Sequence, residues 1–100
     1  INKVDLYGRT PLRDACSGRR LGVAAFLLEK GADINQADAY DRTPLFAACD
    51  GGYVEIVRLL IEKGADLNKA NRAGTTPLAI ALKKNRAGVV VLLRAAGANE

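Results

Sequence analysis

The chain has 100 residues, of which 49% are hydrophobic and 26% are charged, and a formal net charge of +4. This length suffices for one small hydrophobic core, and no apolar run approaches the ~20 residues of a membrane helix. The amino terminus lacks the charged-then-apolar pattern of a secretory signal, so we expect an intracellular, cytoplasmic or nuclear protein without a membrane segment. The modest charge does not by itself indicate binding to nucleic acid or to acidic membranes.

The chain repeats itself with a strict period. The Thr-Pro-Leu motif begins at residues 10, 43 and 76, which are 33 residues apart, and a Gly-Ala pair recurs with the same step at 31, 64 and 97. A period of this length indicates units that cannot bury their apolar faces alone and must stack on one another. We expect one domain with units at 5–37, 38–70 and 71–100, preceded by residues 1–4 as the end of an earlier loop or repeat, because Ile1-Asn2 echoes Ile34-Asn35.

The first unit predicts a turn followed by two helices. A polar turn at 5–8 precedes Thr10, whose side chain can cap a helix in which Pro11 takes the first position. A second apolar segment runs from Leu21 to Glu29, and Gly31 is suited to end it because glycine reaches the left-handed conformation of a helix terminus. The helix near residue 11 and the helix over 21–29 should therefore form a hairpin.

The next two units repeat these elements. Turns are expected at 38–41 and 71–74, first helices near 44 and 77, and second helices over Val54–Glu62 and Ala87–Ala95. Residues 89–93 alone would suggest a buried strand, but their alignment with 56–60 favours a helix. Asp41 stands where the other two turns have glycine, so it is expected to adopt a left-handed conformation at some cost.

The pattern D-x-x-G-x-T-P-L…A…G-A-D-x-N, complete in residues 5–35, resembles the ankyrin repeat. The resemblance extends from residue 5 to 100 and implies an all-α solenoid of stacked helix-turn-helix pairs with projecting β-turn tips. The family's usual histidine after Thr-Pro-Leu is replaced by Arg13, Phe46 and Ala79, which should remove a buried hydrogen bond from each unit. The family's glycine between the two helices is present in the second unit as Gly52. Arg19 replaces it in the first unit and Asn85 in the third, and Arg19 is expected to strain or lengthen its turn.

The resemblance also implies a non-catalytic module that binds another protein on its concave face and turn tips. Tyr7 and Tyr40 are the strongest candidates, because they share one turn position and each precedes an arginine by two residues. A simpler interpretation, in which tyrosine shields its own turn, stays open. Carried over by position, the expected partner-binding residues are Leu6, Tyr7, Arg9, Arg13, Ser17, Tyr40, Arg42, Phe46, Asp50, Arg72, Thr75, Lys83 and Lys84.

Chemistry at a catalytic or metal site is not expected. There is no phosphate-binding glycine loop and no histidine to activate a serine or cysteine, so we expect neither enzyme activity nor a cofactor. Cys16 and Cys49 occupy one position in consecutive units, where stacking separates them by roughly 8–10 Å, beyond the reach of a disulfide. Both are expected to be reduced and buried.

Two alternatives to protein binding remain. Residues 71–100 carry five basic and one acidic group, a net of +4, against +1 for 5–37 and −2 for 38–70. This basic end could bind nucleic acid or a phosphorylated ligand, although no aromatic residue lies among its cations to stack bases. The module could also be a structural spacer in a larger protein. A monomer with a protein partner is the favoured expectation, with Asp14 and Arg94 facing water at the two ends of the stack.

Overall fold

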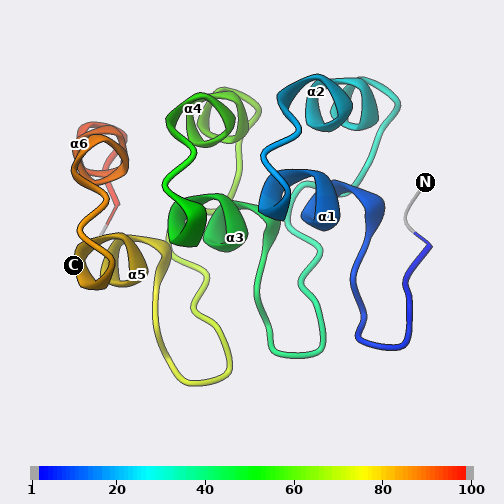
Figure 1. Ribbon diagram of the computed structural model, residues 1–100, viewed down its shortest axis with the longest axis horizontal. Coiled ribbons are helices and arrows are strands. Elements are labelled where there is room, and N and C mark those ends of the chain that lie inside the picture. Colours follow the sequence, from blue (N-terminus) through cyan, green and yellow to red (C-terminus); the bar gives the residue numbers. More distant parts are fainter. Residues whose placement is uncertain (1–2, 99–100) are drawn as a thin grey trace.

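The computed structural model describes residues 3–98, and all regular structure in that range is helical. The helices are α1 (Pro11–Ser17), α2 (Leu21–Glu29), α3 (Pro44–Gly51), α4 (Val54–Glu62), α5 (Pro77–Lys83) and α6 (Ala87–Ala95). Helices α1, α3 and α5 form one row, α2, α4 and α6 form a second row above it, and three turns project below (Figure 1). The expected echo of an earlier repeat at Ile1 and Asn2 lies outside the described residues.

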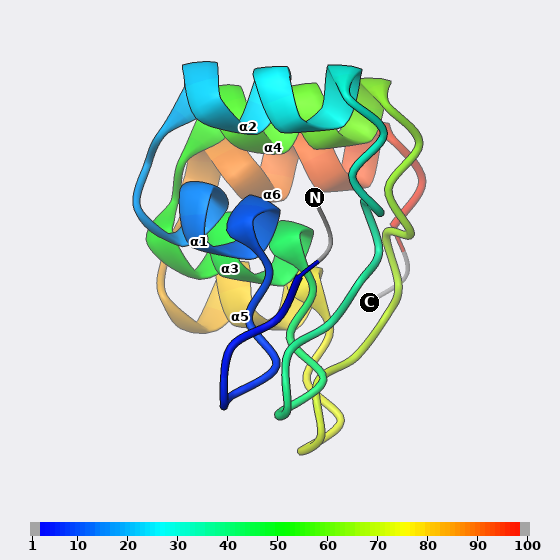
Figure 2. The ribbon, with the colours of Figure 1, turned by 90° about the vertical axis from the view of Figure 1, so that its right-hand side faces the viewer.

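Seen along the stack, the projecting turns leave the first row of helices at an angle, so each unit is L-shaped (Figure 2). The inner side of the L is formed by α1, α3 and α5 together with the turns, whereas α2, α4 and α6 lie on the far side of that row. The predicted stack of helix pairs with projecting tips is therefore confirmed.

The first helix of each unit begins as the sequence predicts. Thr10 Oγ1 accepts a hydrogen bond of 3.1 Å from the backbone N–H of Arg13. Thr43 and Thr76 make the same 3.1 Å bond in the second and third units. Proline occupies the first helical position in each case, where its missing N–H costs nothing. The three helix starts are therefore encoded locally.

The turn between the two helices of each unit requires a left-handed residue. Arg19 has φ 60°, Gly52 has φ 74° and Asn85 has φ 59°. The second helices begin at 21, 54 and 87, so their 33-residue step is kept and the turn at Arg19 is not lengthened. Arg19 instead takes the conformation that costs an ordinary L-residue more than it costs glycine or asparagine.

The core runs continuously through all three units, between the two rows of helices. Leu12, Leu45 and Leu78 hold one position in consecutive first helices, and all three are fully buried. Cys16 and Cys49 are free thiols in this core. Burial raises the pKa of each thiol to about 12 from an ordinary value of 9.0. They act as small apolar side chains, as predicted.

The ends of the stack differ from its middle. Asp14 is exposed, whereas Ala47 and Ile80 at the same position in later units are buried. Arg94 is exposed at the opposite end, where Ile61 in the second unit packs partly into the core. The prediction that Asp14 and Arg94 face water is confirmed, and charged side chains at these positions replace apolar ones that a neighbouring unit would cover.

Candidate functional site

Each projecting turn is built around one acidic or amide side chain. Asp38 Oδ1 accepts hydrogen bonds from the backbone N–H groups of Tyr40 (2.9 Å) and Arg42 (3.0 Å). Asp5 and Asn71 make the equivalent pair of bonds in the first and third turns. The fourth residue of the second turn is Asp41, whose φ of 61° confirms the predicted left-handed conformation. An Asp or Asn side chain stabilises such a turn by replacing a backbone acceptor.

The turns are joined edge to edge. The backbone N–H of Ala39 donates to the carbonyl of Tyr7 at 2.8 Å, and that of Arg72 donates to the carbonyl of Tyr40 at 2.9 Å. Each turn is therefore held by the next one along the stack. The three tips form one continuous edge whose backbones are joined by hydrogen bonds.

Two tyrosine–arginine pairs lie on this edge. The guanidinium of Arg9 lies 5.1 Å from the ring centre of Tyr7, and that of Arg42 lies 5.1 Å from the ring centre of Tyr40. Both tyrosines remain about half exposed, at 54% and 50%. Cations at this distance over an aromatic face stabilise the pair and hold the ring in place. The sequence predicted the residues of these pairs but not their stacking.

Tyr40 differs from Tyr7 in having a second cation. Arg72, from the third turn, places its guanidinium 6.0 Å from the Tyr40 ring centre. The same side chain donates from Nη2 to the carbonyl of Ala39 at 2.7 Å. Ala39 holds in the second turn the position that Arg72 holds in the third, so Tyr7 has no corresponding neighbour on that side. Tyr40 is thus the more firmly held of the two rings.

A buried ion cluster lies beneath the second tip. The carboxylate of Asp38 is fully buried, 2.9 Å from Arg42 Nε and 3.3 Å from Arg13 Nε. Arg13 extends from α1 across the boundary between the first and second units to reach this carboxylate. The Nη1 atom of Arg13 lies 3.6 Å from Asp14 Oδ1. Arg13 therefore links the first and second units at the position where the family's histidine was missing. The alignment of the three repeats alone did not predict the contact between Arg13 and Asp38.

Two of the expected partner-binding side chains are not available on the surface. Phe46 is only 4% exposed and belongs to the hydrophobic core. Arg13 is buried in the cluster with Asp38. Both were expected to border the concave face, but Arg13 reaches Asp38 of the following unit and Phe46 packs in the hydrophobic core. Thr75 is half-buried, and its N–H is bonded to Asn71 Oδ1 at 2.9 Å.

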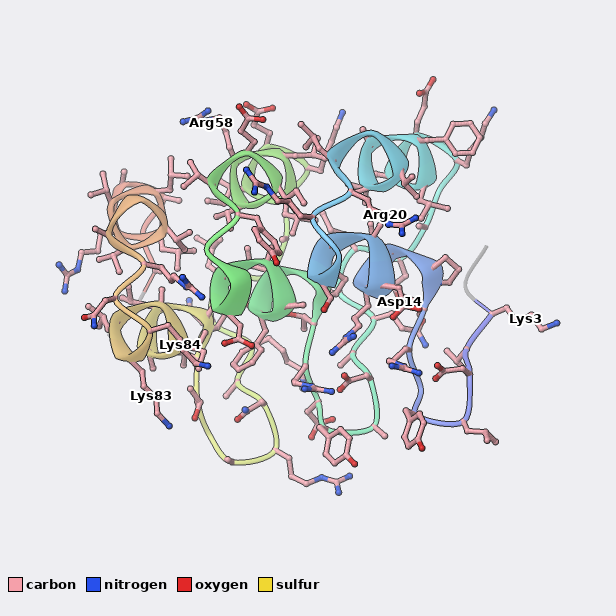
Figure 3. All side chains as sticks on the ribbon, in the orientation of Figure 1. Lys3, Asp14, Arg20, Arg58, Lys83 and Lys84 are labelled. Carbon is pink, nitrogen blue, oxygen red and sulfur yellow. The ribbon has the colours of Figure 1, made fainter. Side chains whose placement is uncertain are left out.

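The carboxyl ends of the first helices carry the remaining predicted residues. Ser17, Asp50 and Lys83 hold one position in successive units, and Ser17 and Lys83 are exposed. Lys84 Nζ lies 3.4 Å from Asp50 Oδ1, an ion pair between the third and second units. Figure 3 shows Lys83 pointing toward the side on which the turns project, while Lys84 is directed at the neighbouring unit. Leu6, at the first tip, is almost completely exposed.

The electrostatics of the tips follow from these bonds. The backbone N–H of Arg9, followed by other hydrogen bonds and the charge of Arg9, lowers the pKa of Asp5 below its ordinary value. The hydrogen bond with Asp5 in turn raises the pKa of Arg9. Both groups are therefore charged over the physiological pH range, and the pair does not titrate there.

Within residues 3–98, no group of three or more His, Cys, Asp or Glu side chains is placed to hold a metal ion. No helix in the same range is both long and apolar enough to cross a membrane. The three tips present exposed aromatic, cationic and hydrogen-bonding groups along an edge whose turns are hydrogen-bonded to one another.

Comparison with protein families agrees with the geometry. A family model described as "Ankyrin repeats (3 copies)" matches residues 36–100, and one described as "Ankyrin repeat" matches residues 7–39. Comparison with curated proteins returns no significant match. The matched ranges cover most of the chain, and the helix pairs and projecting turns have the expected form. The chain belongs to the ankyrin-repeat family, whose members are generally protein–protein interaction modules and typically not enzymes.

Proposed function

We propose that this chain binds a partner protein through a tip surface made of Leu6, Tyr7, Arg9, Tyr40, Arg42 and Arg72, extended by Ser17, Asp50, Lys83 and Lys84 on the first helices. The observation that carries the proposal is the pair of exposed tyrosine–arginine stacks on adjacent, hydrogen-bonded tips. Phe46 and Arg13 are left out because they are buried.

Tyrosine and arginine are the side chains most enriched among residues that dominate binding energy, because each combines a large contact area with directional hydrogen bonding. Here both are held before a partner arrives, so less side-chain entropy is lost on binding. A tyrosine that only shielded its own turn would be largely covered by it. Tyr7 and Tyr40 instead keep about half of their surface exposed, which favours contact with a partner.

The test is quantitative capture of binding proteins from a cell lysate on immobilised wild-type chain and on a Tyr7→Ala/Tyr40→Ala variant. Truncating both rings should remove at least ~2 kcal/mol of binding free energy, about a 30-fold loss, mainly through faster dissociation. Phe26→Ala is the matched control, because Phe26 is also an exposed aromatic (57%) with a cation over its ring, Lys30 at 5.6 Å, but lies on α2. The control should capture the same proteins as wild type. Equal capture by the tyrosine variant would contradict the proposal.

The basic end is the second candidate, with a phosphate-rich ligand. Two of its cations already bond to the protein itself, since Lys84 pairs with Asp50 and Arg86 Nε donates to the Asp50 carbonyl at 3.1 Å. The tips have exposed tyrosines beside their cations, which favours the tips as the binding site. Binding of a polyanion would weaken steeply between ~50 and ~200 mM salt and would be lost on Lys83→Glu/Lys84→Glu. A protein held at the tips should instead survive that double substitution with a slower association rate.

A further inference from the structure

We infer that the partner segment that docks on the tip surface is acidic and places carboxylate side chains beside Tyr40. The inference rests on the proposed function and adds the chemistry of the partner. It follows from which hydrogen-bonding groups and charges of the tips are already occupied within the protein.

The aspartates that close the first two turns, Asp5 and Asp38, are occupied internally. Asp5 receives two backbone N–H groups on Oδ1 and Arg9 Nε on Oδ2, the latter at 2.7 Å. Asp38 receives the equivalent three donors, from Tyr40 and Arg42, and its carboxylate is fully buried. The carboxylate of Asp38 is therefore inaccessible to a partner, and that of Asp5 already accepts three hydrogen bonds.

The arginines of the three turns have donors to spare. Arg9 and Arg42 each use Nε on an aspartate, and Arg72 uses Nη2 on the Ala39 carbonyl. A guanidinium carries five N–H donors in a planar fork. The hydrogen bonds named above use one of these donors in each of the three arginines, and a carboxylate is the protein group that accepts such a fork in bidentate fashion.

The cations concentrate around Tyr40. Two guanidinium groups flank its ring, at 5.1 Å from Arg42 and 6.0 Å from Arg72. A chain packed on this ring would lie beside both of them. Lys83 lies on the same side of the stack, with its charge not offset by an ion pair of the kind that Lys84 makes with Asp50. The immediate surroundings of the Tyr40 ring therefore carry two positive charges, which are complementary to an acidic segment.

Asp41 carries a negative charge on the same tip. Removing it should therefore strengthen binding of an acidic segment, whereas removing an arginine should weaken it. Asp41 is exposed on the second tip, next to Tyr40 in sequence. Asparagine is close in shape and tolerates the left-handed conformation that Asp41 adopts. Asp41→Asn should hence keep the turn while removing a negative charge that repels an acidic partner.

The experiment is selection of a displayed random 12-residue peptide library on the wild-type chain, followed by affinity measurement with the most enriched synthetic peptides. We expect enriched peptides with a clear excess of Asp and Glu, whose binding weakens as salt is raised. Arg72→Gln and Lys83→Gln should each weaken binding about three- to tenfold, and Asp41→Asn should strengthen it up to about threefold. Arg72→Lys should also weaken binding, because an ammonium group keeps the charge but cannot make the bidentate contact. Arg58→Gln is the control, since Arg58 is an exposed cation pointing away from the turns (Figure 3).

The outcomes separate this inference from the proposed function. Enriched peptides that need Tyr40 but carry no excess of acid overturn the acidic partner and leave the tip surface standing. Peptides whose binding survives Tyr7→Ala/Tyr40→Ala overturn both. A selection that enriches no peptide, or peptides whose binding is indifferent to Arg72→Gln and Asp41→Asn in folded variants, also counts against the inference.

Discussion

The buried carboxylate of Asp38 allows a sharp test, because its charge can be removed with almost no change of shape. Asp38→Asn retains the oxygen that closes the turn. The third tip shows that asparagine suffices for this, since Asn71 Oδ1 accepts the N–H groups of Ala73 at 3.0 Å and Thr75 at 2.9 Å. The substitution therefore keeps the turn but removes the negative charge, together with the hydrogen bond that Oδ2 accepts from Arg42 Nε. Asp5→Asn removes the equivalent bond from Arg9 Nε in the first turn.

The size of the loss follows from what surrounds that charge. Asp38 is fully buried and faces Arg42 at 2.9 Å and Arg13 at 3.3 Å. Removing one member of a buried ion pair costs about 3–5 kcal/mol, because the other is left uncompensated. Arg42 is partly exposed and Arg13 keeps a contact with Asp14, so we expect a loss of about 2–3 kcal/mol in the free energy of unfolding. Asp5→Asn removes the same charge from a pair that is 39% exposed on both sides, and it should cost clearly less than Asp38→Asn because solvent screens the pair.

The measurement is urea denaturation of the two variants followed by circular dichroism, with a double-mutant cycle that adds Arg13→Met to Asp38→Asn. Because Arg13 is then no longer a stranded cation, the cost of Asp38→Asn should fall by at least ~1 kcal/mol in that background. Equal losses for Asp38→Asn and Asp5→Asn, or an uncoupled cycle, would refute the view that Arg13 and Asp38 join the first two units.

Three further predictions concern the core and the backbone. Leu60→Ala should lower the free energy of unfolding by about 2–5 kcal/mol. Leu27 holds the same position in the first unit but is only partly buried, so Leu27→Ala should cost less. Similar costs for the two variants in urea denaturation would contradict the stacking. Asp41→Gly should stabilise the fold by roughly 0.5–1 kcal/mol by relieving a φ of 61°, and an unchanged or lower denaturation midpoint would argue against that strain. Burial raises the pKa of Cys16 and Cys49 to about 12, so both thiols should resist iodoacetamide at pH 8 in the native state. Because the folded protein favours the protonated thiols, the free energy of unfolding should fall as the pH rises from 9 to 12. Alkylation as fast as in the unfolded chain would disprove their burial.

Much of the fold could be predicted because its signals are short-ranged. Thr10, Thr43 and Thr76 bind an N–H three residues away, so the start of each first helix depends only on local residues. The left-handed conformation of Asp41 follows in the same way from its place in a turn whose counterparts have glycine. The 33-residue period then implies stacking without any knowledge of individual contacts.

The candidate site could be predicted only in part. The exposure of Tyr7 and Tyr40 was expected from their position in the turns, and both are exposed. The second cation beside Tyr40 was not expected, because it is Arg72 from the next unit. A turn pattern read within one unit carries no information about a side chain that reaches across a boundary.

The sequence by itself determined the repeat, the helix starts and ends, and the positions of the tips, because these depend on hydrogen bonds and backbone conformations within a few residues. Only the tertiary structure decided that Phe46 belongs to the core, that Arg13 and Asp38 meet between units, and that Tyr40 is held by two arginines. Each of these depends on the separation and tilt of neighbouring units, which result from packing side chains of the whole stack against one another and which no single repeat specifies.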